Sequence, residues 1–446
     1  MASEILKSEL DLFKKVSFQG AIENSQIIQY RPITALSETS AIEFDIPISP
    51  DEYLDLQNIY LWIRGKVVQQ NNAVYPAAQD KRYSLINYAL FTIFDQLDVT
   101  LAGTLVTQSS KTFQYQSFIE ALTQSTSLAA LTYLEAAGFN SNFGTAKDFD
   151  NISEDLFKNV KRSKEFTLYG RLHGSIFNSD RLLLNGVPVH LTFTRANPRF
   201  CVMGRPIQVA DATATPVIPA LDATEPKFQL LDISLFARKV KLSPNLLNAH
   251  ARAIQISKAV YPIKRPVMKI VNLPANQSTF ILDNVITGQL PCKLIIGLVS
   301  NDAFSGTFTT NPLKFANENV NFLCVHINGE IYPKTPYTPD YTVGSEKYER
   351  EYHDLFMNLG ANKTISQPAI ELSNFPKGFC LYAFNFNSDF ENANENEYIN
   401  IPKDGYLNIE IRFGANIQNA LKLICYALFD NTIEIDENRN VTIDYA

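Results

Sequence analysis

The chain carries the same series of sequence patterns twice, in the same order. Each series opens with a strand, a glycine turn and a return strand, and continues with apolar residues at helical three-to-four spacing. The hairpin patterns are Val99–Leu105 and Val325–Ile331, and the helical patterns lie around Tyr115–Leu122 and Tyr348–Phe356. Two later matches pair Asn185-Gly186 and Ala196-Asn197 with Asp404-Gly405 and Ala415-Asn416, and Leu235–Leu242 with Leu428–Ile435. Four matches in one order predict two copies of one β-rich fold.

Apolar residues at every second position indicate strands with one buried face. Clear examples are Ile42, Phe44 and Ile46; Val187, Val189, Leu191 and Phe193; and Leu407, Ile409, Ile411 and Phe413. Asn185-Gly186 and Asn328-Gly329 lie between such segments and are typical of tight hairpin turns. We therefore expect an all-β protein of two tandem jelly-roll sandwiches. Each should have about eight strands and a helix between the fourth and fifth.

With 446 residues the chain suits two domains better than one. We expect a first sandwich over 41–242, a connector helix over 243–260 and a second sandwich over 261–435. Ser243 could cap the connector helix, and Pro244 suits its first turn. Residues 436–446 would be a C-terminal tail. Residues 1–40 would be an N-terminal arm with a short amphipathic helix, formed by Ile5, Leu6, Leu10, Phe13 and Val16.

Two loop-like segments without a clear repeat partner suggest an orientation. Gln208–Pro226 is rich in Ala, Thr, Pro and Asp, and Phe386–Tyr398 is rich in Asn and acidic residues. We expect both to emerge at the same end of the sandwiches and to face outward.

Charge and apolar patterning argue against several classes of function. The net charge is -7 and Lys and Arg are evenly scattered, so no basic face is available for direct binding of nucleic acid. The sequence shows no apolar run of signal-peptide type and no membrane span, since even Phe118–Phe139 is broken by Glu120, Gln124 and Glu135. The five cysteines are distant from one another and lie in apolar runs, which predicts reduced core residues.

Candidate sites for chemistry are weak, and we expect no catalytic, cofactor-binding or metal-binding residues. The histidines never form the His-x-His pair of cupin metal sites; they are His173, His190, His250, His326 and His353. Paired carboxylates for a glycosidase cannot be singled out among 46 Asp and Glu. The acidic residues Asp389, Glu391, Glu395 and Glu397 could bind calcium, but a solvated loop is favoured because they lack calcium-loop spacing.

The second half of the chain strongly resembles the double-jelly-roll major capsid proteins of Polinton (Maverick) elements and adintoviruses, which are distantly similar to those of virophages. The resemblance rests on Tyr261-Pro262-Ile263, Gly288-Gln289-Leu290-Pro291, Ile295–Val299 with Ala303-Phe304, Asn311–Phe315, Asn328-Gly329, Arg350-Glu351-Tyr352 with Leu355-Phe356, and Ile435–Val441. Thinner matches in the first half are Phe44–Pro47, Glu52–Leu56 and Lys241–His250. Leu313 departs from the expected Phe.

This resemblance implies a structural protein of the virion with no catalytic residues. It implies homotrimeric, pseudo-hexagonal capsomers (hexons) that tile an icosahedral capsid around a double-stranded DNA genome. The implied partners are the chain itself, neighbouring capsomers, and penton and minor capsid proteins. Synthesis would take place in the host cell, with assembly in its nucleus.

The main alternative is a two-domain carbohydrate-binding or receptor-binding β-sandwich protein. Such a protein should present an aromatic platform in its loops. Here most aromatic residues lie in strand-like runs, and Trp62 lies in the alternating run Tyr60–Val68. A glycosidase-type or cupin-type enzyme ranks third.

Overall fold

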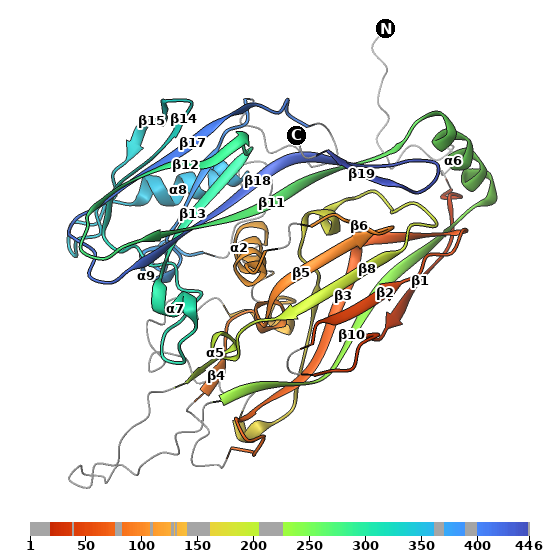
Figure 1. The fold of residues 1–446 in the computed structure, drawn as a ribbon, viewed down its shortest axis with the longest axis horizontal. Coiled ribbons are helices and arrows are strands. Elements are labelled where there is room, and N and C mark those ends of the chain that lie inside the picture. Colours follow the sequence, from red (N-terminus) through yellow and green to blue (C-terminus); the bar gives the residue numbers. More distant parts are fainter. Residues whose placement is uncertain are drawn as a thin grey trace, which may run out of the picture.

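The computed structural model describes residues 18–37, 40–75, 83–107, 110–125, 129, 132–140, 161–204, 226–360, 370–388 and 399–444. Two β-sandwiches follow one another along the chain (Figure 1). Each sandwich has one four-stranded antiparallel sheet on each side of its core, and the larger sheet of the second carries one extra strand.

The first sandwich is formed by the first half of the chain. Its outer sheet, here called sheet I, has the strand order β1 (Ile22–Tyr30), β10 (Pro226–Leu242), β3 (Glu52–Gln69), β7 (Phe166–Arg171). The facing sheet has the order β2 (Ile42–Ile46), β8 (Val189–Arg195), β5 (Phe94–Leu101), β6 (Thr104–Leu105). A short ribbon of β4 (Tyr83–Leu85) and β9 (Val202–Gly204) extends one end.

The second sandwich repeats this strand order. Its sheet II, the counterpart of sheet I, has the order β11 (Ala259–Leu273), β18 (Leu421–Ile435), β13 (Lys293–Ser300), β16 (Leu381–Asn385). The facing sheet has the order β12 (Thr279–Gln289), β17 (Asp404–Phe413), β14 (Val320–Ile327), β15 (Glu330–Tyr337). Each of the eight strands therefore has a counterpart at the same place in the other sandwich. The prediction of two jelly rolls is confirmed.

Each of the two cores contains an aromatic pair at an equivalent place. Phe44 on β2 meets Phe193 on β8 edge to face, with ring centroids 6.0 Å apart. At the same place in the second sandwich, Phe280 on β12 meets Phe413 on β17 edge to face at 5.9 Å. These pairs join neighbouring strands on the inner face of each sheet, where edge-to-face packing is favourable.

Each sandwich carries a helix directly after its hairpin, as the repeated pattern predicts. These helices are α2 (Phe113–Gln124) and α8 (Glu349–Leu359). The expected position between the fourth and fifth strands is wrong, because the helices lie between the fifth and sixth of the eight sandwich strands: α2 between β6 and β7, and α8 between β15 and β16. Shorter helices are α1 (Ala89–Thr92), α5 (Pro198–Cys201), α7 (Asn301–Ser305), α9 (Phe375–Gly378) and the 3-10 turns Glu135–Ala137, Lys161–Ser163 and Ser175–Asn178. The connector is α6 (Pro244–Ile256), and Ser243 precedes it without a capping side-chain hydrogen bond.

Both ends of the chain contribute strands where no strand was expected. Strand β1 lies within the expected arm and pairs with β10 from Ile22 to Tyr30. Alternation did not reveal it because β1 is an edge strand with mostly exposed residues. At the other end, β19 (Val441–Asp444) pairs with β18, within the expected tail. The helix expected from Ile5 to Val16 lies outside the described residues.

The described strand ends that flank the two loop-like segments lie at opposite ends of their sandwiches, so the expectation that both segments emerge at one end is wrong. Gln208–Pro226 leads into β10, whose first residue pairs with Gln69 at the end of β3. Phe386–Tyr398 follows β16, whose last residue Asn385 pairs with Lys293 at the start of β13. Because β3 and β13 are counterparts, these are opposite ends. Most residues of both segments lie outside the described parts of the chain.

Candidate functional site

Helix α2 of the first sandwich packs against sheet II and the neighbouring segments of the second (Figure 1). Tyr115 stacks on Phe304 of α7 with centroids 5.5 Å apart, and Phe118 stacks on Phe315 at 6.3 Å. Nearly every residue of α2 from Phe113 to Leu122 is buried. Large aromatic contacts of this kind bury much apolar surface and hold the two sandwiches in one arrangement.

A buried polar network crosses this junction. Glu120 on α2 accepts hydrogen bonds at Oε1 from the Tyr426 hydroxyl of β18 at 3.1 Å and from Gln116 Nε2 at 3.0 Å. Its Oε2 lies 3.0 Å from His173 Nδ1, and the Tyr88 hydroxyl contacts the other nitrogen of that ring. Burial is the main cause that raises the pKa of Tyr88 well above its ordinary value, and the charge of Glu120 adds to it. Since Glu120 and Tyr426 are 2% and 1% exposed, the network serves packing better than catalysis.

A second contact between the sandwiches lies near the connector. The Arg439 guanidinium donates to the backbone oxygen of Asn185 at 2.7 Å and to its Oδ1 at 2.9 Å. The Tyr261 hydroxyl accepts from the Leu184 backbone N–H at 3.0 Å and donates to the Leu182 carbonyl at 3.1 Å. Both contacts hold the loop before β8 against the second sandwich.

An apolar hollow of about 530 Å³ lies against α6. Its wall includes Leu246 and Ile254 of the helix, Tyr261 of β11, and Ala21 and Ile22 at the start of β1. None of the residues of α6 is buried. The helix therefore keeps an apolar face open in the single chain.

The five histidines each have a different partner. A ring nitrogen contacts a carboxylate oxygen in four of them: His173 contacts Glu120, His190 Asp45, His326 Glu410 and His353 Asp354. The ring of His250 hydrogen-bonds with the Tyr53 hydroxyl. No two histidines share a ligand set of the cupin type. All five cysteines are free and buried, as expected.

One histidine nevertheless belongs to a mixed cluster of donor atoms on the second sandwich. Cys324 and His326 lie two residues apart on β14, and Cys324 pairs with Glu410 of β17. Burial, together with the charge of Glu410, raises the pKa of Cys324 to about 11, so the free thiol stays protonated. Burial opposes ionisation of Glu410, but hydrogen bonds from Arg412 and His326 lower its pKa. Sequence spacing missed this cluster because Glu410 comes 84 residues after His326.

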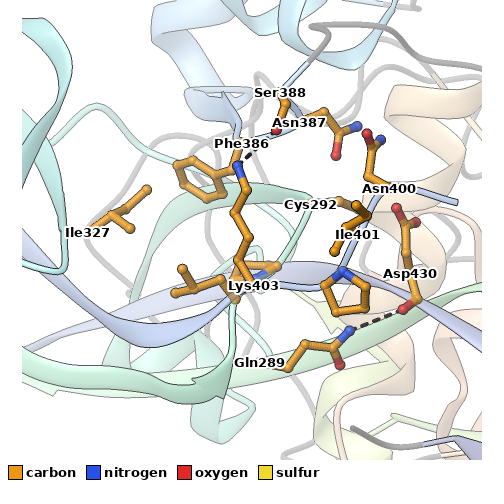
Figure 2. A pocket seen from close by; sticks show the side chains of 13 residues that line it. Gln289, Cys292, Ile327, Phe386, Asn387, Ser388, Asn400, Ile401, Lys403 and Asp430 are labelled. Atoms are coloured by element: carbon orange, nitrogen blue, oxygen red, sulfur yellow. Dashed lines mark hydrogen bonds between the residues drawn. The ribbon is translucent and has the colours of Figure 1, made fainter.

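Figure 2 shows a small pocket between the end of β12 and the segment that leads into β17. Gln289 donates to the backbone oxygen of Asp430 at 3.1 Å, and Lys403 donates to Ser388 at 2.8 Å (Figure 2). Burial first, and then Asp430, raise the pKa of Cys292 to about 12, so its thiol is not an activated nucleophile. The cavity is about 130 Å³, well below the roughly 300–1,000 Å³ of typical ligand sites. It does not suit a substrate.

The acidic candidates for calcium, Asp389, Glu391, Glu395 and Glu397, lie outside the described residues. Among the described helices, none has the length and apolar character needed to cross a membrane.

The two sandwiches differ in which of their surfaces are covered. The central strands of sheet II, β13 and β18, are buried along most of their length and are therefore covered on both faces. Sheet I is open on its outer face, where Tyr60, Trp62, Tyr169 and Phe236 form a group that we call the aromatic strip. The rings of Tyr60 and Tyr169 stack at 5.3 Å, and Tyr169 meets Phe236 edge to face at 6.0 Å. Likewise α8, the counterpart of the buried α2, has only Glu351 and Leu355 buried.

Comparison of the sequence with known proteins gives one distant relative. No protein-family model matches the chain. An uncharacterized protein of Caenorhabditis elegans is 23% identical over 438 residues, which span 96% of this chain and 98% of that protein.

Comparison of the structure gives whole-length similarity to capsid structures. The Sputnik virophage structure matches with a TM-score of 0.63 and 14% identity, over 100% of this chain and 94% of that chain. The Faustovirus major capsid protein matches with a TM-score of 0.60 and 10% identity, over 96% and 92%. A chain of the PBCV-1 virus capsid matches with a TM-score of 0.57 and 11% identity, over 97% and 99%. At these identities the similarity establishes the double-jelly-roll fold.

Proposed function

We propose that this double-jelly-roll chain is a major capsid protein, related to those of the Polinton and adintovirus group, and that it forms homotrimeric, pseudo-hexagonal capsomers. The capsomers tile an icosahedral capsid around a double-stranded DNA genome. The observation that carries this proposal is the repetition within the chain. The two sandwiches are alike, and α2 of the first covers sheet II of the second, whereas the corresponding surfaces, α8 and the outer face of sheet I, are open. The whole-length similarity to capsid chains supports it.

The internal packing of the chain suggests how copies assemble. Within one chain, α2 of the first sandwich covers the outer face of sheet II. Their counterparts, α8 and the outer face of sheet I, are both open. If α8 of one copy covers sheet I of the next, the same type of contact repeats around a ring. Three copies supply six sandwiches, and a head-to-tail contact that closes on itself gives cyclic symmetry.

The aromatic strip fits such a contact better than it fits solvent. Interface centres are enriched in Tyr, Trp and Phe. Tyr169 is 39% exposed in the single chain, and Tyr60, Trp62 and Phe236 are partly covered. Burying these rings against a neighbour would stabilise the ring of three by the same effect that holds α2 in place.

This function requires no chemistry from the chain, so we propose a structural and non-enzymatic role in the virion. Neighbouring capsomers and penton and minor capsid proteins would be its partners, with assembly in the host nucleus. The net charge of -7 argues against direct contact with the genome.

The test is the particle formed by the purified full-length chain. Light scattering coupled to gel filtration should give three times the mass of one chain at micromolar concentration, and negative-stain electron microscopy should show near-hexagonal outlines. A stable monomer without capsomer-like particles would overturn the proposal.

The rival function, carbohydrate or receptor binding, predicts a different result. The exposed aromatic residues of the described chain lie on separate parts of it, including Phe18, Tyr133, Tyr169 and Tyr406, and the aromatic strip lies on strands. Saturable binding on a glycan array by a monomeric chain would favour the rival.

A further inference from the structure

We propose that Cys324, His326 and Glu410 form a zinc site on the outer face of the second sandwich. The side chains lie on neighbouring strands, two on β14 and one on β17. Each offers one donor atom, a sulfur, an imidazole nitrogen and a carboxylate oxygen. This mixed set suits Zn²⁺, which accepts all three donor types, and it does not suit Ca²⁺ or Mg²⁺, which prefer oxygen.

Two of the three distances between the donor atoms are close to the edges of a zinc tetrahedron. Cys324 Sγ lies 3.5 Å from His326 Nε2, and Nε2 lies 3.2 Å from Glu410 Oε2. With ordinary zinc bond lengths, the corresponding edges of a tetrahedron are about 3.6 and 3.4 Å. The remaining edge, between Cys324 Sγ and Glu410 Oε2, is 4.0 Å and has to shorten by about 0.4 Å.

The side chain of Arg412 orients the carboxylate of Glu410. The Arg412 guanidinium donates to the other oxygen of Glu410, Oε1, through Nε at 2.9 Å and Nη2 at 2.5 Å. Arg412 in turn lies over the Phe322 ring, 4.5 Å from its centroid. Glu410 is therefore held with Oε2 toward Cys324 and His326, which is the support that metal-binding carboxylates usually have.

The burial of the cluster leaves a way in for the ion. Cys324 is fully covered, whereas the side chains of His326 and Glu410 are 23% and 12% exposed. A cation can therefore reach the site from the His326 side, and water can supply the fourth ligand. A thiolate, a carboxylate and the Arg412 guanidinium sum to one negative charge, which favours a divalent cation.

Cobalt(II) is the probe, because it replaces zinc in tetrahedral sites and absorbs visible light. The full-length chain, without a histidine tag, is treated with chelator, dialysed and titrated with Co²⁺. We expect d–d bands of four-coordinate cobalt and a thiolate-to-cobalt charge-transfer band, both saturating at one ion per chain and both lost on adding Zn²⁺. A wild-type chain without the charge-transfer band would overturn the proposal.

Variants assign the ligands. Cys324→Ser should abolish the charge-transfer band, and Cys201→Ser, at a buried cysteine of α5, should leave it unchanged. His326→Gln and Glu410→Gln should weaken Co²⁺ binding by at least about tenfold. A band that persists in folded Cys324→Ser sinks the assignment. If that variant does not fold, the partly exposed His326→Gln decides it, since unchanged affinity there would also reject the site.

Discussion

The hydroxyl of Tyr426 donates a hydrogen bond of 3.1 Å to Oε1 of Glu120, across a separation of 306 residues in the chain. Tyr426 belongs to β18 of the second sandwich and Glu120 to α2 of the first, and both are almost completely buried. A carboxylate at such a place needs donors, because an unpaired buried charge is costly. The pair therefore couples the packing of the two sandwiches.

Replacing this tyrosine tests the coupling. Tyr426→Phe removes one donor from Glu120 and leaves the ring in place, so we expect a loss of about 1.5–3 kcal/mol of stability. The readout is a lower melting temperature in calorimetry. Tyr406→Phe, at a tyrosine 42% exposed, is the matched control and should melt like the wild type. Equal melting temperatures for both variants would show that the hydrogen bond contributes nothing.

Gly297 of β13 has no room for a side chain. A Cβ there would lie 2.6 Å from Phe315 and 2.8 Å from Leu381. Both side chains are fully buried in the core and cannot easily move away. Gly297→Ala should therefore lower the free energy of unfolding by about 1–3 kcal/mol through overpacking. Gly20→Ala, where nothing lies within 4 Å, is the control in the same unfolding experiment. A neutral effect at Gly297 would mean that the core repacks freely.

Two N-terminal deletions separate the arm from strand β1. Deleting residues 2–30 removes β1 and exposes the edge of β10, so this variant should be destabilised or insoluble. The expected arm of residues 1–40 thus contains a strand that belongs to sheet I. Deleting only residues 2–17 should leave trimers of near-wild-type melting temperature that fail to form closed shells. The spacing of Ile5–Val16 predicts a helix whose apolar face would need burial, and the apolar hollow beside α6 lies next to Ala21. Normal shells from the shorter deletion would refute a role of the arm in assembly.

A charge in the aromatic strip should break the trimer. In Tyr169→Glu a residue of the proposed interface becomes a carboxylate that the neighbouring copy would have to desolvate, so scattering should report monomers with an unchanged circular dichroism spectrum. Tyr133→Glu changes a tyrosine that is 67% exposed and belongs to no strand of sheet I, and should remain trimeric. Trimers from Tyr169→Glu would place the interface on another surface.

Glu351 on α8 makes stability depend on pH. Burial raises its pKa in spite of hydrogen bonds from its own N–H and that of Thr338. A raised carboxyl pKa means that ionising Glu351 costs more free energy in the folded state than in the unfolded state. This cost to stability is absent below the unfolded-state pKa, where the carboxyl is protonated in both states. It is complete above the folded-state pKa, where the carboxyl is ionised in both states. Glu351→Gln should therefore melt higher than the wild type at neutral pH and lose this advantage near pH 4 or below, about the ordinary pKa of Glu. Glu349→Gln, exposed on the same helix, is the control. A difference that persists at low pH would contradict the assignment.

Local patterns in the sequence determined much of the fold. The alternation at Ile42–Ile46 and Leu407–Phe413, the hairpin at Asn328-Gly329 and the helical spacing of α2 and α8 are all found in the structure. Such patterns arise because a half-buried strand or helix needs apolar residues on one face, and this requirement is written in consecutive residues. The repetition of the patterns then implied two sandwiches.

Tertiary structure alone decided the features that depend on pairing between distant segments. Strand β1 is exposed on most of its residues and carries no alternation, so only its pairing with β10 makes it a strand. The donor atoms of Cys324, His326 and Glu410 meet because β14 and β17 pair in one register, and a shift by one residue would turn Glu410 to the other face. The sequence also could not show that α2 is enclosed while its counterpart α8 stays open. Both helices satisfy the same local pattern, and what covers each one depends on how the two sandwiches pack in space.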